Sequence, residues 1–157
     1  CISSQNWGGR GKAHSMKRSL AGLALAIVAA SSCAAMAAEQ RISPASGGYT
    51  EFMLPSGNIG CIYTPDGGTD VYQPEDGGPE LQCDRMEPTY LRAILGASGK
   101  GKIHKNVGDA SCCSGPTLRY GNAVTLGPYY CESEQTGLTC YRDNNGIFLS
   151  RRKTNAW

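Results

Sequence analysis

The stretch TLGPYYCESEQTGLTCYRDNNGIFLSR, residues 125–151, decides the fold class of this chain. Residues 125–131 and 137–142 are predicted as two strands joined by ESEQT. Asn145-Gly146 lies between two apolar runs and predicts a tight hairpin turn, because both turn residues need positive φ. No segment shows a long helical stripe. We therefore predict a mainly β fold, with a small antiparallel sheet that is barrel-like or a sandwich and carries long Gly- and Pro-rich loops.

Shorter segments upstream fit the same antiparallel pattern. YTEFML (49–54) and NIGCIYT (58–64) are predicted strands on either side of a PSGN turn. LQCD (81–84) returns the chain to the sheet. TYLRAIL (89–95) fits a strand or a short helix, and its periodicity does not decide between them.

The N-terminal part has the order of a secretory signal peptide. Basic residues follow Met16, small or apolar residues occupy 20–30, and Ala-Met-Ala at 35–37 fits an A-x-A cleavage site. The apolar run is shorter than the about 20 residues that span a bilayer. We predict a signal peptide at 16–37, cleaved near Ala37, and a secreted or periplasmic bacterial protein without a transmembrane segment.

This cleavage divides the chain into parts. Residues 1–15 do not begin with Met and are interpreted as an upstream extension or a cloning scar. Residues 38–48 are small and polar and are predicted as a flexible arm, which precedes a single disulfide-rich β domain at 49–153. A lipid anchor on Cys33 is the less favoured alternative, because Ala-Ser-Ser before it departs from the usual lipoprotein pattern.

The cleavage also reverses the net charge. The whole chain has 15 basic and 13 acidic residues and a net charge of +2. Four basic and no acidic residues precede residue 38, so the exported part keeps 11 basic residues and carries −2. Because a nucleic-acid-binding protein needs a basic footprint, we predict no nucleic-acid partner. The predicted partner is an unknown protein, an envelope component or a small ligand.

Six cysteines remain after cleavage and are interpreted as a disulfide framework, which is typical of small exported chains. Cys61 and Cys83 flank an acidic loop, and Cys131 and Cys140 lie on successive predicted strands, so both pairs suit cross-strand bonds. By elimination the last two are the neighbours Cys112 and Cys113. Either these form a strained vicinal bond or one of the simple pairs is wrong. A zinc site is not favoured, because no C-x2–4-C spacing occurs.

Two glycine-rich loops, at 65–80 and 96–103, carry residues that could bind a ligand. GASGKGKI (96–103) nearly matches a phosphate-binding loop, but Ile103 stands where a hydroxyl must reach magnesium. In the other loop Asp66, Asp70 and Asp76 are weak calcium candidates, since carboxylates can supply oxygen ligands. Their spacing matches no EF-hand loop. We predict solvated surface loops, no metal and no cofactor.

Candidate catalytic residues are few. His104 has no partner nearby in the sequence, and Ser56 and Ser150 are interpreted as turn or surface serines. Asp84 and Glu87 could serve as the paired acids of a small envelope hydrolase, although any β protein contains such pairs. We therefore assign no catalytic residue, and the enzyme hypothesis is not the favoured one.

Binding is the favoured hypothesis. Tyr129, Tyr130 and Arg151 are weak binding candidates, because aromatic and Arg side chains are favoured in recognition patches. We predict a non-catalytic binding or envelope-associated module, which could act as an inhibitor. The alternatives are the hydrolase above and a thiol-redox protein that uses Cys112 and Cys113.

Several short motifs add a resemblance to a known family. They occur in the order PSGNIGC (55–61), LQCD (81–84), YG (120–121), GPYYC (127–131), TGLTC (136–140) and GIFLSR (146–151). Over residues 50–152 the chain resembles a family of exported bacterial domains of unknown function with PSGNI-x-C, GP-[FY]-x-C, GLTC and G-x-FLSR motifs. The resemblance implies a small secreted or periplasmic domain with paired cysteines, and it implies no reaction. The chain departs from the family pattern after Cys83 and beside Cys112, which leaves the third disulfide open.

Overall fold

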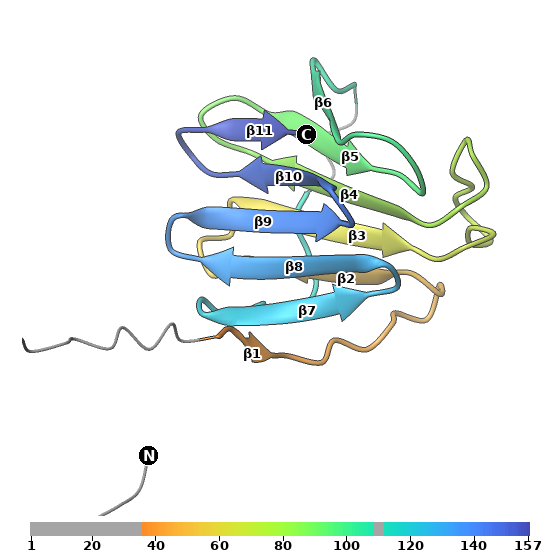
Figure 1. Ribbon diagram of the computed structural model, residues 1–157, viewed down its shortest axis with the longest axis horizontal. Helices are drawn as coiled ribbons and strands as arrows, with labels where there is room; N and C mark the ends of the chain where they lie inside the picture. Colours follow the sequence, from red (N-terminus) through yellow and green to blue (C-terminus); the bar gives the residue numbers. More distant parts are fainter. Residues whose placement is uncertain (1–35, 109–111) are drawn as a thin grey trace, which may run out of the picture. The chain divides into compact units, whose positions relative to one another are not determined.

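Two β-sheets face one another in the computed structural model, which describes residues 36–108 and 112–157 (Figure 1). Sheet A has the order β1-β7-β8-β9-β10-β11, and sheet B has the order β2-β3-β4-β5-β6. The strands are β1 (Ala38–Glu39), β2 (Thr50–Met53), β3 (Ile59–Thr64), β4 (Glu80–Arg85), β5 (Leu91–Leu95), β6 (Lys102–Lys105), β7 (Asn122–Leu126), β8 (Tyr129–Glu134), β9 (Gly137–Arg142), β10 (Asn145–Leu149) and β11 (Thr154–Ala156). The mainly β prediction is confirmed, and the architecture is a sandwich rather than a barrel.

All the predicted strands upstream of residue 96 are present, and 49–54 contains β2. The segments 58–64 and 81–84 form β3 and β4, and 89–95, for which helix and strand were both open, contains the strand β5. The predicted loop that begins with 96–103 is wrong in part, because β6 begins at Lys102. Ile103 explains the difference, since this residue pairs with Ala93 of β5 and packs against the hydrophobic core.

Two predictions near the C-terminus need correction. The segment 125–131 is not one strand, because the chain turns at Gly127, with φ of 55°, between β7 and β8. The last hairpin exists, but its turn is Asp143-Asn144, and Asp143 has the positive φ of 53°. Asn145 already pairs with the end of β9. The predicted hairpin is therefore confirmed, but its turn lies two residues earlier in the chain than predicted.

Gly146 is needed for packing rather than for the turn. It lies inside β10 and exchanges backbone hydrogen bonds of 2.9 and 3.0 Å with Trp157. A Cβ at this position would lie 2.4 Å from Cζ2 of the Trp157 ring. The absence of a side chain lets the C-terminal residue lie flat against the strand.

Strands also lie outside the predicted domain limits of 49–153. The predicted flexible arm at 38–48 begins with β1, which pairs in parallel with β7. Gln40 then donates its backbone N–H to the carbonyl of Ala123 at 2.7 Å. At the other end β11 continues sheet A to Ala156.

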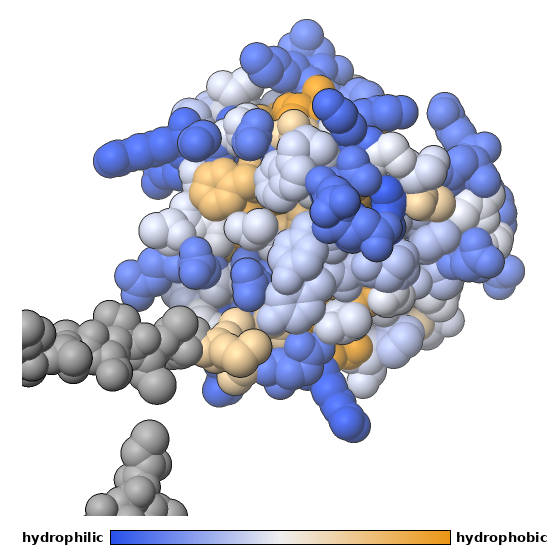
Figure 2. Space-filling view, in the orientation of Figure 1, coloured by the Kyte–Doolittle hydropathy of each residue, from blue (hydrophilic) through white to orange (hydrophobic). Residues whose placement is uncertain are grey.

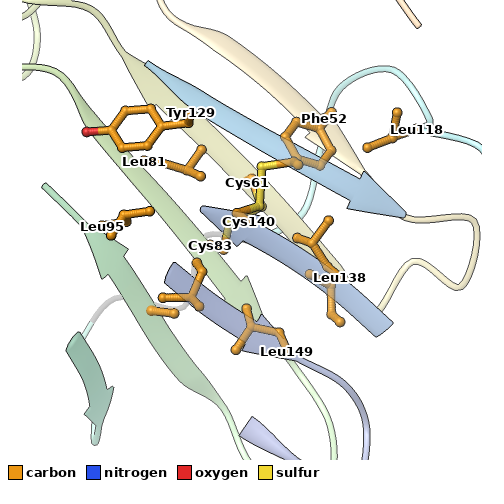
Figure 3. Packing of buried hydrophobic residues seen from close by; sticks show 14 of the residues in the cluster. Phe52, Cys61, Leu81, Cys83, Leu95, Leu118, Tyr129, Leu138, Cys140 and Leu149 are labelled. Atoms are coloured by element: carbon orange, nitrogen blue, oxygen red, sulfur yellow. A yellow bond between two sulfur atoms is a disulfide. The ribbon is translucent and has the colours of Figure 1, made fainter. Parts of the chain in front are cut away.

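The core lies between the sheets (Figure 3), and it contains two disulfides. Cys61 faces Cys83 across β3 and β4, and Cys131 faces Cys140 across β8 and β9. Both predicted cross-strand pairs therefore lie at disulfide distance. The sulfur atoms of Cys61, Cys83 and Cys140 lie within 4.8 Å of one another, so the two cystines meet in the centre of the core.

Residues 1–35 lie outside the described residues, and with them the predicted upstream extension, Cys33 and most of the predicted signal peptide. In the part of the chain that the structure describes, no helix is long and apolar enough to cross a membrane.

Candidate functional site

A hollow of about 390 Å³ lies between turns at one end of the sandwich. These turns are on the left in Figure 1. We call this hollow the end groove. Its lining comes from the β2–β3 turn, the β4–β5 connection, the β8–β9 turn, the β10–β11 turn and Tyr120 before β7. Both sheets therefore contribute to the same surface, and the contributing segments are far apart in the sequence.

The PSGN turn forms one wall of the end groove. Gly57 has a φ of 67° and donates its N–H to the carbonyl of Leu54 at 2.9 Å. Asn58, in contrast to Gly57, does not take a positive φ. Its side-chain amide instead exchanges two hydrogen bonds with the backbone of Glu87, at 2.7 and 3.1 Å. The PSGN turn, which connects β2 and β3, is thus joined to the β4–β5 connection by these two hydrogen bonds.

Arg85 supports the groove from inside. This residue is 7% exposed, and its guanidinium donates to the carbonyls of Ser150 at 2.9 Å and Thr89 at 3.2 Å. Burial lowers the pKa of Arg85. Sequence reasoning missed this role. The alternation of side chains along a strand could have predicted the burial of Arg85. Residues two apart in a strand share a face, so Arg85 lies on the same face as Cys83, which faces the core.

The β10–β11 turn brings a cation to the rim. The Ser150 hydroxyl accepts the N–H groups of Arg152 at 3.3 Å and Lys153 at 3.0 Å, and donates to the Lys153 carbonyl at 3.1 Å. Arg151 lies at the turn and pairs with Glu87 at 2.6 Å, with both side chains mostly exposed. Of the three predicted binding residues, Arg151 is the one that lines the end groove.

The lining of the end groove combines apolar and polar groups. Leu54 and Ile59 lie buried beneath it, and the side chains of Met86 and Tyr120 are 40% and 37% exposed beside it. Glu134 adds a second carboxylate. Such a surface can hold an apolar group and hydrogen-bond its polar neighbours.

The two tyrosines predicted as binding candidates lie elsewhere. Tyr129 is fully buried and donates its hydroxyl to the carbonyl of Pro79 at 2.5 Å. Tyr130 points to the outer face of sheet A, where its ring centroid lies 5.3 Å from that of Tyr141. Figure 2 shows that hydrophobic residues on this face are scattered rather than gathered. This face therefore offers no broad apolar patch.

The predicted acid pair does not form one site. Asp84 is buried and accepts two hydrogen bonds of 2.8 Å from Arg92, as well as one from the Tyr90 hydroxyl. Burial, and the hydrogen bond to Asp84, raise the pKa of Tyr90. Glu87, in contrast, lines the end groove and pairs with Arg151.

The remaining candidates also lie outside the end groove. Cys112 and Cys113 are joined in the structure as a vicinal disulfide on the outer face of sheet B, over Gly60. His104 is exposed on β6. Among the described residues the only cluster of candidate metal ligands is the set of core cysteines, which form disulfides. The candidate calcium ligands, Asp66, Asp70 and Asp76, are not gathered into such a cluster.

No protein-family model, curated protein or solved structure matches this chain. The family resemblance therefore stays a prediction. Four of the segments on which it rests nevertheless meet at the end groove, through Ser56 and Asn58, Tyr120, Gly137, and Arg151.

Proposed function

We propose that this protein is an exported, non-catalytic binding module and that its end groove holds the partner, a protein or an envelope component. One observation carries the proposal: four distant motif segments converge on a single hollow that leaves Met86 and Tyr120 exposed. Two of the motifs fold as rigid turns whose polar groups are already engaged, so the surface is preorganised. Preorganisation lowers the entropy that binding costs.

The rim ion pair suits recognition. Arg151 and Glu87 are 73% and 63% exposed, and an exposed pair contributes only about 0–1 kcal/mol to stability. Each of the two side chains can therefore leave the other and bind a charged group of a ligand, with little loss of stability of the fold. The hydroxyl of Ser150 is engaged by the turn backbone, and no histidine lines the described part of the groove. This arrangement supports binding better than nucleophilic catalysis.

Cross-linking to envelope extract tests the proposal with two matched variants. The double variant Met86→Ala/Tyr120→Ala removes the exposed groove side chains, whereas Tyr141→Ala removes a ring that is also 37% exposed but lies on sheet A. We expect a partner captured by the wild type and by Tyr141→Ala, with capture by the double variant reduced about fivefold or more, as for interface anchors. Equal capture by all three proteins, or no specific partner, would overturn the proposal.

The thiol-redox alternative keeps one supporting observation. Cys112 and Cys113 are partly exposed, unlike the four core cysteines, so a small thiol reagent can approach them. No geometric observation favours the hydrolase alternative, since Asp84 and Glu87 have different partners.

A further inference from the structure

A second hollow, of about 470 Å³, lies on the outer face of sheet B. We call it the sheet-B groove. Its floor includes Ile62 of β3 and Gln82 of β4, which are direct neighbours in the ladder, and Arg92 of β5. No hydrogen bond between the Gln82 amide and another described residue is present, so its donors and acceptor are available to a ligand. The sheet-B groove shares no lining residue with the end groove.

An ordered turn forms the wall of the sheet-B groove. The β3–β4 loop projects from the end of the sandwich opposite the end groove (Figure 1). Within this loop Thr69 donates its backbone N–H to the carbonyl of Tyr72 at 2.8 Å, and its hydroxyl accepts the N–H of Tyr72 at 3.1 Å. Gln73 closes the turn through a bond of 3.0 Å to the Thr69 carbonyl.

Tyr72 is held in place and yet accessible. Its hydroxyl donates to a carboxylate oxygen of Glu80 at 2.8 Å, and the residue remains 44% exposed. Burial, together with this hydrogen bond, raises the pKa of Tyr72 to about 12. Tyr49 adds a second aromatic side chain to the lining. An aromatic ring fixed in this way is a rigid platform that loses little conformational entropy when a ligand stacks on it.

The two charged side chains that line the sheet-B groove already have polar partners. Arg92 makes a two-point ion pair with the buried carboxylate of Asp84, and Glu80 accepts the Tyr72 hydroxyl. An anionic ligand is disfavoured, because Arg92 is paired with Asp84 whereas Glu80 keeps its negative charge. A neutral ligand with many hydroxyl groups fits better, because each hydroxyl can donate to a carboxylate or accept from an amide.

We propose that the sheet-B groove binds a neutral oligosaccharide. Tyr72 stacks on the apolar face of a sugar ring, Gln82 and Glu80 hydrogen-bond the ring hydroxyls, and Arg92 is a positioning residue that orders the floor. The hollow of about 470 Å³ is within the range of about 300–1,000 Å³ that small-ligand sites occupy. A peptide strand is a poorer occupant, because strand addition needs a free sheet edge and this hollow lies on a sheet face.

Calorimetric titration of the folded protein with cellohexaose, chitohexaose, maltohexaose and xylohexaose tests the proposal. We expect one of these neutral probes to bind and Tyr72→Ala to weaken its binding at least tenfold. Tyr72→Phe keeps the stacking ring but loses the hydrogen bond to Glu80, so it should weaken binding less than Tyr72→Ala does. Gln82→Ala should weaken binding by a factor of about three to ten, the usual range for one lost hydrogen bond.

Three results would overturn the assignment: no binding by any of the four probes, wild-type affinity in Tyr72→Ala, or tighter binding of hexagalacturonate than of every neutral probe. The end-groove variant Met86→Ala/Tyr120→Ala is the matched control and should bind the oligosaccharide normally. Because the two hollows have no residue in common, failure of this inference and failure of the proposed function are separable.

Discussion

At the scale of single residues, Gly60 shows how a missing side chain positions a distant segment. A Cβ at Gly60 would lie 2.7 Å from Cβ and 2.9 Å from Sγ of Cys113. We expect Gly60→Ala to displace the vicinal cystine and to lower the free energy of unfolding by about 1–3 kcal/mol, the usual cost of overpacking. Urea unfolding measures the change. Gly108→Ala is the control, since no atom of the described residues lies within 4 Å of its Cβ, and equal stability of the two variants would contradict the prediction.

The ionisation of Tyr129 should make the fold less stable as the pH rises through the alkaline range. Burial raises the pKa of Tyr129 from 10.0 to about 12. The folded protein therefore keeps this proton after the unfolded chain has lost it, and the contribution to stability is complete below pH 10 and lost as the pH rises to about 12. Over this range we expect the wild type to lose up to about 3 kcal/mol more than Tyr129→Phe.

The measurement is urea unfolding at a series of pH values, with Tyr141→Phe on the exposed ring as the control. At neutral pH the Tyr129→Phe protein should be less stable by about 1 kcal/mol, because the hydrogen bond to Pro79 is lost. Parallel pH profiles of Tyr129→Phe and the wild type would show that Tyr129 does not cause the alkaline loss.

At the scale of elements, runs of β-forming residues around a cysteine were enough to predict β3, β4 and β9. The strand β6 was missed, because the sequence KIHK carries one apolar residue and three polar ones. Turn positions were less predictable than strands. Asp143 takes the positive φ, although Asn145-Gly146 is the stronger turn signal, because Gly146 is required in the strand beside Trp157.

The two core disulfides allow a matched comparison of elements. Both are buried between paired strands, but Cys61–Cys83 spans 22 residues of sequence and Cys131–Cys140 spans 9. Replacing either pair by alanine should cost about 2–5 kcal/mol. The longer loop should cost about 0.7 kcal/mol more, because its closure removes more entropy from the unfolded chain. Thermal unfolding of the two double variants checks the order, and the reverse order would indicate that packing rather than loop length decides.

At the scale of the whole molecule, each sheet contributes a buried arginine that hydrogen-bonds backbone carbonyls of the other sheet's connections. Arg85 of sheet B donates to the carbonyl of Ser150 in sheet A's last turn. Arg142 of sheet A donates to the carbonyls of Gly96 and Gly99 between β5 and β6. The candidate site depends on the first of these contacts, because Ser150 lines the end groove. Sequence reasoning could place Arg151 on a surface, but it could not see that loops from both sheets meet there, because their proximity arises only when the sheets pack.

The exposure of the cysteines predicts the order in which the whole molecule is reduced. Cys61, Cys83, Cys131 and Cys140 are at most 2% exposed, whereas Cys112 and Cys113 are only partly buried. With a mild dithiol reductant under native conditions, we expect the vicinal pair to be reduced and alkylated first. The core cystines should react only after unfolding, because a reductant must reach the sulfur.

Intact mass with and without reductant and alkylating agent measures this order on protein recovered from the periplasm or medium. No alkylation before reduction and two alkylated cysteines after mild reduction are expected, on a chain that starts near Ala38. That start leaves β1 intact, since Ala38 donates its N–H to the carbonyl of Gly121 at 3.2 Å. Two free thiols before any reductant would contradict the vicinal bond and shift the weight to thiol-redox chemistry. A lipid-bearing chain that starts at Cys33 would instead place the module at a membrane surface.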